Sequence, residues 1–332
     1  MTVTEVGRRS PDSSNRRPEN SDELVIQARR EVAANVIELT LRRPDGSRLP
    51  DWSPGAHIDL ILPSGTVRQY SLCGDRWDGH SYRIAVQREE DGTGGSKEIH
   101  QVAAEGSHVR FGGPRNNFRL APAEQYHFIC GGIGITAIRP MIDQAERMGI
   151  EWRLLYLGRN PLRMAYRDLE NWYPAQVRTH TTAHGKRASI REWLGEVDDT
   201  SMVYACGPQS LLDALPSECD RLPDQRIRVE HFTNDSLNSA PIRTDPYEIV
   251  LDRKGETVRA EGHQSVAEAL GDAGIGLITS CSRGVCGTCE LSVLAGEVDH
   301  RDTILDDEER AAGTCMFPCV SRAASDRLVI DL

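Results

Sequence analysis

Four cysteines near the C-terminus have the spacing needed to bind an iron–sulfur cluster. They are Cys281, Cys286, Cys289 and Cys319. The first three follow the pattern C-x4-C-x2-C and the fourth stands alone, which is the arrangement of plant-type [2Fe–2S] ligands. Gly284 and Gly287 allow the backbone to fold tightly between the ligands, so that amide N–H groups can point at the sulfurs. Such a cluster carries one electron at a time.

Two other interpretations of the same cysteines remain open. A four-cysteine zinc site usually pairs two short C-x2-C knuckles, whereas here three cysteines share one loop. A redox-active C-x-x-C pair at Cys286 and Cys289 would leave Cys281 unexplained, and the βαβ surroundings of such a pair are lacking. The spacing therefore favours the cluster.

Glycine-bearing strand ends form a second candidate site. The glycines are Gly131, Gly132 and Gly134. They lie between a predicted strand at 126–130 and a predicted helix, where backbone amides can receive a pyrophosphate. The spacing is not G-x-G-x-x-G, and such a turn is also a common structural connection. Cys206-Gly207-Pro208 ends a later predicted strand, and two such ends at one sheet edge define a crevice.

The segment Arg68-Gln69-Tyr70-Ser71 offers groups for a flat, phosphorylated cofactor. It supplies a guanidinium for phosphate, an aromatic ring for packing and a hydroxyl for a ring nitrogen, although such a tetrad also occurs in ordinary strands. Gly92-Thr93-Gly94-Gly95-Ser96 precedes a predicted helix at 97–104 and is a further possible phosphate cradle. Its order does not match a P-loop.

The elements that must position these residues fall into three groups. Residues 23–121 contain short alternating stretches at 36–41, 57–62 and 82–86, separated by Gly, Pro and Asp, which predict a small antiparallel β-barrel. Residues 122–233 contain strand candidates with helical segments between them, which predict a parallel α/β sheet. The strand candidates are 126–130, 153–157, 177–181, 202–206 and 227–230. The helix after the glycine turn has an apolar face and stops at Gly149; the face consists of Ala137, Ile138, Met141, Ile142, Ala145 and Met148.

The termini of this arrangement have their own patterns. Residues 1–22 lack apolar periodicity and predict a disordered tail. Residues 234–246 are rich in turn formers and predict a linker. In residues 247–332, strands at 247–251 and 256–261 can pair, and Ser265 with Glu268 forms a capping box for a helix ahead of the cysteine loop.

Charge and cysteine usage limit the class of protein. The formal net charge is -11, which disfavours nucleic-acid binding. Residues 247–332 contain 16 Asp and Glu against 8 Lys and Arg, so this segment has either an acidic docking face or a plain solvated surface. Nine cysteines without a signal peptide or a long apolar stretch predict a cytoplasmic protein without membrane contact.

These motifs together resemble the phthalate dioxygenase reductase and vanillate demethylase reductase family. The resemblance rests on Arg68-x-Tyr70-Ser71, the run from Gly131 to Thr136, Cys206-Gly207-Pro208 and the cysteine run, and it extends through His300-Arg301-Asp302 and Cys319–Ala323. The order of flavin, nicotinamide and ferredoxin domains is typical of this family. The implied folds are an antiparallel β-barrel, a parallel α/β domain and an α+β, β-grasp-like ferredoxin domain.

The resemblance implies roles for individual residues. The FMN-binding residues would be Arg68, Tyr70, Ser71, Ala85, Val86, Gly94, Gly95 and Ser96. The nicotinamide cofactor would contact Gly131, Gly132, Gly134, Cys206, Gly207 and Pro208. Thr136 would lie near both cofactors, and Phe232 would be either an aromatic beside the nicotinamide face of the flavin or a core residue. Cys206 would adjust the nicotinamide pose or simply fit as a small residue.

Two choices also follow from the family resemblance. Arg159 could pair with the 2′-phosphate of NADPH, but the family generally uses NADH, which we therefore expect. Cys315 competes with Cys319 as fourth ligand; the residues after Cys319 match the family and favour Cys319.

The implied function is electron transfer. Hydride from NADH would reduce FMN, and single electrons would pass through the cluster to a separate terminal oxygenase. A Rieske non-haem iron enzyme for aromatic hydroxylation or O-demethylation is the expected partner, and a cytochrome P450 is the alternative. A redox sensor without a dedicated acceptor is the alternative of another class. The protein is expected to be a monomer.

Overall fold

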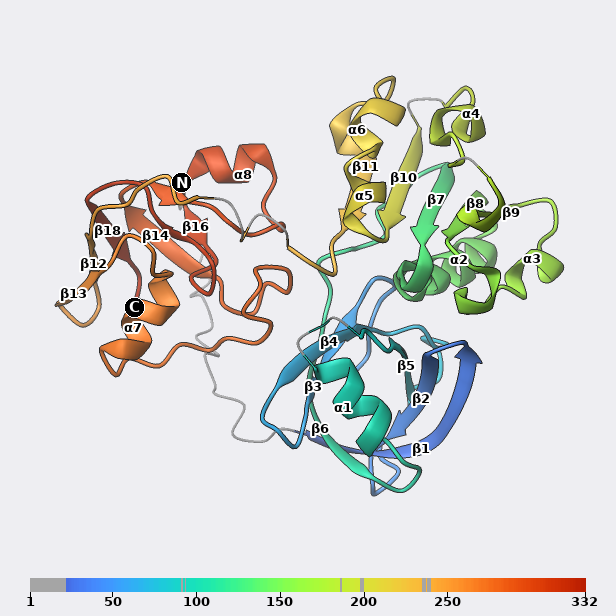
Figure 1. Cartoon of the computed structure of the whole chain (residues 1–332), viewed down its shortest axis with the longest axis horizontal. Coiled ribbons are helices and arrows are strands. Elements are labelled where there is room, and N and C mark those ends of the chain that lie inside the picture. The colour runs from blue at the N-terminus through green and yellow to red at the C-terminus, as the bar shows by residue number, and fades with distance from the viewer. Residues whose placement is uncertain are drawn as a thin grey trace, which may run out of the picture.

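The computed structural model describes residues 22–90, 92, 94–185, 187–197, 200–234, 237 and 240–332. It contains a six-stranded sheet, two five-stranded sheets and a two-stranded sheet (Figure 1). The predicted multidomain class is confirmed, with an antiparallel barrel, a parallel α/β sheet and an α+β unit in that order. The tail predicted over 1–22 lies outside the described residues except for Asp22, which begins the first strand and is not part of a tail.

The N-terminal sheet has the strand order β4-β3-β6-β1-β2-β5, and its neighbouring strands pair antiparallel. Its strands are β1 (Asp22–Ala33), β2 (Val36–Arg42), β3 (His57–Ile61), β4 (Val67–Ser71), β5 (Tyr82–Gln87) and β6 (His108–Arg115). Alternate side chains such as Leu39, Ile58 and Ile84 fill the interior. Helix α1 (Gly95–Val102) follows β5.

The central sheet is parallel, with the strand order β11-β10-β7-β8-β9. Its strands are β7 (Gln125–Gly131), β8 (Glu151–Gly158), β9 (Val177–Thr181), β10 (Ser201–Cys206) and β11 (Ile227–Glu230). Helices α2 (Ile135–Met148) and α3 (Leu169–Trp172) pack on one face. Helices α4 (Ile190–Leu194), α5 (Gln209–Leu212) and α6 (Leu215–Glu218) pack on the other. The sheet is buried on both faces, as parallel sheets generally are.

Helix α2 confirms most of the predicted apolar face. Five of its six residues are buried, and they pack against the central sheet. The prediction was wrong for Met148, which is the last residue of the helix and is 52% exposed. Gly149 then ends the helix in a left-handed conformation, with φ of 67°.

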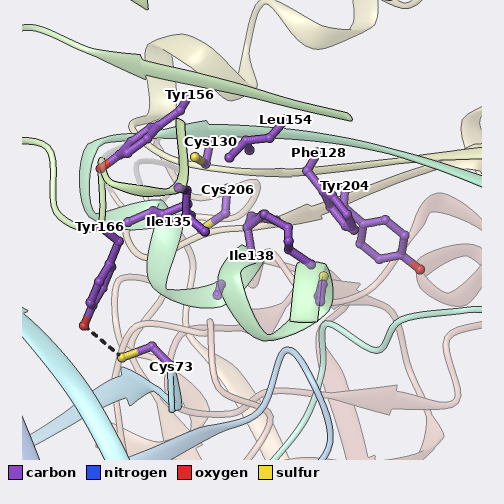
Figure 2. Close-up of a cluster of buried hydrophobic side chains, with 14 of the residues drawn as sticks. Cys73, Phe128, Cys130, Ile135, Ile138, Leu154, Tyr156, Tyr166, Tyr204 and Cys206 are labelled. Carbon is purple, nitrogen blue, oxygen red and sulfur yellow. Dashed lines mark hydrogen bonds between the residues drawn. The ribbon is translucent and has the colours of Figure 1, made fainter. Parts of the chain in front are cut away.

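The barrel and the central sheet share a hydrophobic core (Figure 2). Val36, Cys73 and Ala85 of the barrel belong to the same buried cluster as Ile135 of α2 and Tyr156 of β8. The barrel also has its own interior, but the shared cluster joins it to the central sheet. The two units therefore meet through close apolar packing.

The C-terminal unit has a mixed sheet in the order β13-β12-β18-β14-β16. Its strands are β12 (Tyr247–Leu251), β13 (Glu256–Ala260), β14 (Leu291–Ala295), β16 (Cys315–Met316) and β18 (Arg327–Ile330). β15 (Val298–Asp299) pairs with β17 (Arg322–Ala323). Helix α7 (Val266–Asp272) begins at the predicted capping box of Ser265 and Glu268, and α8 (Asp307–Ala312) follows β15.

The segment predicted as a linker over 234–246 contacts the C-terminal unit where it is described. Asn234 Nδ2 donates to the carbonyl oxygens of Arg283 and Arg301, at 2.7 and 2.6 Å. Arg301 also donates to Ala240 O and to Asp299. Polar contacts thus hold the start of this segment beside the cysteine loop.

Candidate functional site

The barrel end of the site is built around Arg68 and the first turn of α1. The side chain of Arg68 lies along Gly95, where a Cβ atom would stand 2.6 Å from Arg68 Nε, so only glycine permits this approach. Burial and the neighbouring Arg283 guanidinium hold the pKa of Arg68 below its ordinary value. Positive charge and helix N-terminal amides therefore meet here, which is the environment that a phosphate group prefers.

The other predicted flavin residues are distributed around this point. Tyr70 follows Arg68 on β4, and burial raises the pKa of its hydroxyl. Ser71 is buried at the end of the strand, and Ala85 faces the core shared with the central sheet. Val86 faces the barrel interior instead, so only its backbone is available to a ligand. Gly94 and Ser96 flank Gly95 at the start of α1, where Ser96 Oγ accepts a hydrogen bond from Glu89 N at 3.0 Å.

The two glycine-bearing strand ends of the central sheet lie in contact. A Cβ atom on Gly134 would stand 2.2 Å from Cys206 O, and one on Gly131 would stand 2.6 Å from Pro208 Cδ. A Cβ atom on Gly207 would stand 2.9 Å from the backbone N of Gly131. The structure thus brings the predicted turn and the predicted Cys-Gly-Pro segment to one sheet edge. Small residues there leave backbone amides accessible to a dinucleotide.

Three further predicted residues surround this edge. Thr136 is buried in the first turn of α2, where its hydroxyl donates to Ile133 O at 2.8 Å. Phe232 is partly exposed and packs against the shared core, which agrees with either role considered for it. Arg159 is exposed just after β8, away from the packed interior.

Sequence reasoning did not assign a role to Glu230, which lies at the same edge. It is the ladder partner of Cys206 at the ends of β11 and β10, and Cys206 Sγ lies 3.9 Å from Glu230 Oε2. Burial of its carboxyl group raises the pKa of Glu230 to about 8, and burial likewise raises the pKa of Cys206. A carboxyl group at a strand end, two residues before an aromatic, was the signal that could have identified it.

The four cysteines predicted as ligands come together in the C-terminal unit. Cys281 interacts with Cys286 and Cys319, and Cys319 also interacts with Cys289. The amide of Arg283 donates to Cys281 Sγ at 3.3 Å, as the predicted amide–sulfur contacts require. Among the described residues, no group of three or more histidine, cysteine, aspartate or glutamate side chains is arranged to hold a metal ion. Paired thiols suit two irons with two ligands each better than one zinc ion.

Cys315 is placed differently from these four. It lies in β16 opposite Ser292 of β14, and its charged neighbours are Glu290, Glu309 and Asp302. By contrast, Cys319 has sulfur neighbours, and the amide of Gly284 also donates to it. The geometry therefore groups Cys319, and not Cys315, with the cysteine loop.

The barrel and cysteine-loop parts of the site are in direct contact. Gln69, between Arg68 and Tyr70, donates from Nε2 to Ser280 Oγ at 2.6 Å, and Ser280 immediately precedes Cys281. A Cβ atom on Gly287 of the loop would stand 2.9 Å from Asn117 Nδ2, just after the barrel. The cysteine loop therefore rests against the strand that carries the predicted flavin residues.

Comparisons with known proteins match each part of this arrangement. Residues 249–324 match the model of the 2Fe-2S iron-sulfur cluster binding domain. The phthalate dioxygenase reductase of Burkholderia cepacia is 33% identical, over 93% of this chain and 97% of its own length. The chain belongs to the phthalate dioxygenase reductase family.

Solved structures agree with this membership. A phthalate dioxygenase reductase, described as a modular structure for electron transfer from pyridine nucleotides to [2Fe-2S], aligns with a TM-score of 0.69 and 33% identity over 93% of this chain and 97% of that one. An intact type IV self-sufficient cytochrome P450 monooxygenase aligns with a TM-score of 0.87 and 38% identity, over 98% of this chain but 43% of the P450 chain.

Membership in the phthalate dioxygenase reductase family establishes the general chemistry. The chain is an oxidoreductase that transfers electrons and has flavin-binding, nicotinamide-binding and [2Fe–2S] units. No helix among the described residues has the length and apolar character to span a bilayer.

Proposed function

We propose that this protein is an NADH-dependent reductase that passes electrons through FMN and a [2Fe–2S] cluster to a separate terminal oxygenase. The observation that carries the proposal is the 2.6 Å hydrogen bond from Gln69 to Ser280. It joins the strand of Arg68 and Tyr70 to the residue before Cys281, so electrons would cross from the barrel to the cysteine loop at a direct contact.

Three separate sets of residues would bind the flavin, the nicotinamide cofactor and the cluster. FMN would be held by Arg68, Tyr70, Ser71, Ala85, Val86, Gly94, Gly95 and Ser96. The nicotinamide cofactor would be held by Gly131, Gly132, Gly134, Thr136, Arg159, Cys206, Gly207, Pro208 and Phe232. The cluster would be held by Cys281, Cys286, Cys289 and Cys319. A flavin accepts hydride and releases electrons singly, and the cluster carries them one at a time.

The chain's own groups mainly place these cofactors. The Arg68–Gly95 approach supports a terminal phosphate, and it fits FMN because the phosphate ends the molecule. The close contact of Gly134 with Cys206 supports a bound dinucleotide along the sheet edge. The neighbouring Cys281 thiol and burial raise the pKa of Cys286, and iron would supply the positive charge that its thiolate needs.

The first test concerns the cofactors themselves. Purified protein should show the visible absorption of a flavin with a [2Fe–2S] cluster, and the flavin released by acid should be FMN. Anaerobic addition of NADH should bleach both chromophores. In steady-state turnover, the KM for NADH should be lower than the KM for NADPH. A colourless protein that binds neither iron nor flavin would contradict the proposal.

The terminal acceptor needs a separate test, because relatives point in two directions. The reductase of a phthalate dioxygenase supports a Rieske-type non-haem iron partner that hydroxylates or demethylates aromatic compounds. The aligned P450 monooxygenase supports a cytochrome P450 partner as the second candidate. Mixing the protein and NADH with purified oxygenases of each type should give product with the Rieske enzyme. Product with the P450 alone would favour the second candidate.

A redox sensor is the remaining candidate of another class. A reductase should reduce cytochrome c rapidly with NADH, whereas a sensor without a dedicated acceptor should turn over slowly. We also propose that the protein acts as a cytoplasmic monomer, which sedimentation of the holoprotein would test.

Arg68→Ala tests the flavin assignment directly. The variant should release most of its FMN, because it loses the guanidinium that approaches Gly95, while its iron content stays unchanged. Flavin fluorescence in the filtrate and iron analysis measure the two effects. Arg88→Ala, which removes an exposed arginine paired with Glu90, serves as the control and should retain FMN. Full FMN retention in Arg68→Ala would remove Arg68 from the site.

A further inference from the structure

A buried carboxylate joins the barrel to the central sheet. Glu38 lies on β2 and is 4% exposed. Tyr166 OH donates to its Oε2 at 2.8 Å, and Arg139 Nη1 lies 3.9 Å from the same oxygen. Arg30 Nε donates to Oε1 at 3.0 Å. Tyr166 and Arg139 belong to the central unit, so a barrel carboxylate is satisfied from both sides of the interface.

The Tyr166 hydroxyl has a second barrel partner. Figure 2 shows it pointing at Cys73, whose Sγ lies 3.4 Å away. Tyr166 also has φ of 56°, in the left-handed region that bulky residues rarely adopt. Such a conformation persists only where the surroundings impose it, and it often occurs at functional sites. In this protein the left-handed backbone conformation occurs at the residue whose side chain reaches the interface between the central unit and the barrel.

On the nucleotide side, Tyr166 is tied to the glycine turn. Tyr156 OH lies 2.9 Å from Ala165 O and 3.1 Å from Gly132 O, so it bridges the residue before Tyr166 to that turn. The guanidinium of Arg139 lies 4.4 Å above the Tyr166 ring. Arg139 follows Thr136 by one turn of α2, so the ring supports the same turn of helix that carries Thr136.

On the flavin side, both partners of the hydroxyl adjoin predicted flavin residues. Glu38 is paired with Ala85 across the ladder of β2 and β5. Cys73 follows Ser71 by two residues at the end of β4. The contacts of one hydroxyl therefore connect the nucleotide turn with two strands of the flavin site.

We propose that the Tyr166 hydroxyl is a positioning group for hydride transfer, which fixes the spacing between the nicotinamide and flavin sites through Glu38 and Cys73. This inference rests on the proposed function. Hydride transfer needs the reacting atoms within a narrow range of distance and angle, and a displacement of about 1 Å can slow a reaction roughly 100-fold. A hydroxyl at the interface that joins the two sites is placed to control that range.

Tyr166→Phe in the holoprotein tests the proposal, because it removes the hydroxyl and keeps the ring. Anaerobic stopped-flow mixing with NADH should show a rate constant for flavin reduction at least about tenfold lower, while the Kd for NAD+ changes less than about threefold. Hydrogen exchange of amides 132–139 should be faster than in wild type, which is a readout independent of turnover. Tyr126→Phe is the matched control, since Tyr126 is buried in the same core and donates to Ala121 O at 2.8 Å, at the far end of β7.

Defined outcomes would overturn the proposal. If Tyr166→Phe lowers the Tm but leaves the rate constant and the exchange of 132–139 unchanged, the hydroxyl is only structural. Equal slowing in Tyr126→Phe would likewise remove the specific role. If wild-type flavin is not reduced by NADH, the proposed function fails, whereas a fast wild type with an equally fast Tyr166→Phe refutes this inference alone.

A second variant covers a failure of Tyr166→Phe to fold. Glu38→Gln keeps an acceptor oxygen but removes the charge that strengthens the hydrogen bond. It should also slow flavin reduction, because the Tyr166 hydroxyl is held less firmly. A Glu38→Gln protein with wild-type flavin reduction and wild-type exchange would refute the proposal.

Discussion

Glu230 is a carboxyl group whose protonation changes the charge of the crevice. Burial raises its pKa from 4.5 to about 8, so it is mostly neutral at pH 7 in the folded protein. In the unfolded chain it ionises from about pH 4.5 upward. Between these values the unfolded state binds fewer protons than the folded state, so ionisation of this group lowers stability as pH rises through that window.

Glu230→Gln should therefore be increasingly more stable than wild type as pH rises from 5 to 8, with no further gain above that range. The Tm of both proteins, measured across pH 5 to 9, checks this. Glu248→Gln, which changes an exposed glutamate of β12, should show no such trend. A Tm difference for Glu230→Gln that does not change with pH would mean that the carboxyl group titrates normally.

Two cysteines that are four residues apart, Cys315 and Cys319, are the candidates for the fourth cluster ligand. Cys319→Ser should lose the visible absorption and iron of the cluster, because its sulfur contacts Cys281 and Cys289. Cys315→Ser should keep both, because Cys315 lies in β16 among acidic side chains. Iron analysis and absorption spectra of the two variants measure this. The reverse pattern would assign the ligand to Cys315.

At the scale of elements, sequence patterns predicted the strands that alternate clearly. The predicted strands at 177–181, 227–230 and 247–251 agree with β9, β11 and β12, and the capping box starts α7 as expected. β1 and β6 were not predicted. Of residues 23–33 of β1, only Leu24 and Ile26 are buried, and β6 contains a single buried residue, Phe111, next to two glycines and a proline. Such exposed strands lack the period-2 signal.

Sequence patterns likewise predicted some features of the candidate site and not others. The cysteine run and the glycine turn are local patterns, and their members were predicted from sequence. The contacts between elements were not predictable, because Gln69 and Ser280 are 211 residues apart and Glu38 and Tyr166 are 128 apart. Only the folded chain brings such polar groups together, and each residue alone is unremarkable on its strand or loop.

The strand–loop contact gives a prediction at this scale. Ser280→Ala should leave reduction of the flavin by NADH unchanged but slow electron transfer from flavin to cluster several-fold, because the loop loses its hydrogen bond to Gln69. Stopped-flow traces at flavin and cluster wavelengths separate the two steps. Gln69→Ala should act alike, and Gln125→Ala, at the start of β7, is the control. Unchanged transfer in both interface variants would show that the contact does not set the rate.

At the scale of the molecule, two kinds of interface connect the three units. The barrel and the central sheet share a buried apolar cluster, whereas the C-terminal unit has a separate core. Among the described contacts of the C-terminal unit with earlier parts of the chain are two hydrogen bonds. Gln69 donates to Ser280, and Asn234 donates to the carbonyl oxygen of Arg283. Apolar burial couples folding units strongly, while a neutral hydrogen bond contributes only about 1 kcal/mol. The barrel and the central sheet therefore have interiors of their own but are also joined by a shared core, whereas the C-terminal unit shares no buried cluster with them.

This asymmetry predicts two cooperative unfolding transitions and not three. Calorimetry of the holoprotein should show one transition that coincides with loss of cluster absorption and another that coincides with release of flavin and loss of NAD+ binding together. Val36→Ala removes two methyl groups from the shared core and should lower only the flavin transition, by about 1 kcal/mol or more in free energy. Val293→Ala, in the core of the C-terminal unit, should lower only the cluster transition. If Val36→Ala instead uncoupled flavin release from loss of NAD+ binding, the two N-terminal units would be independent.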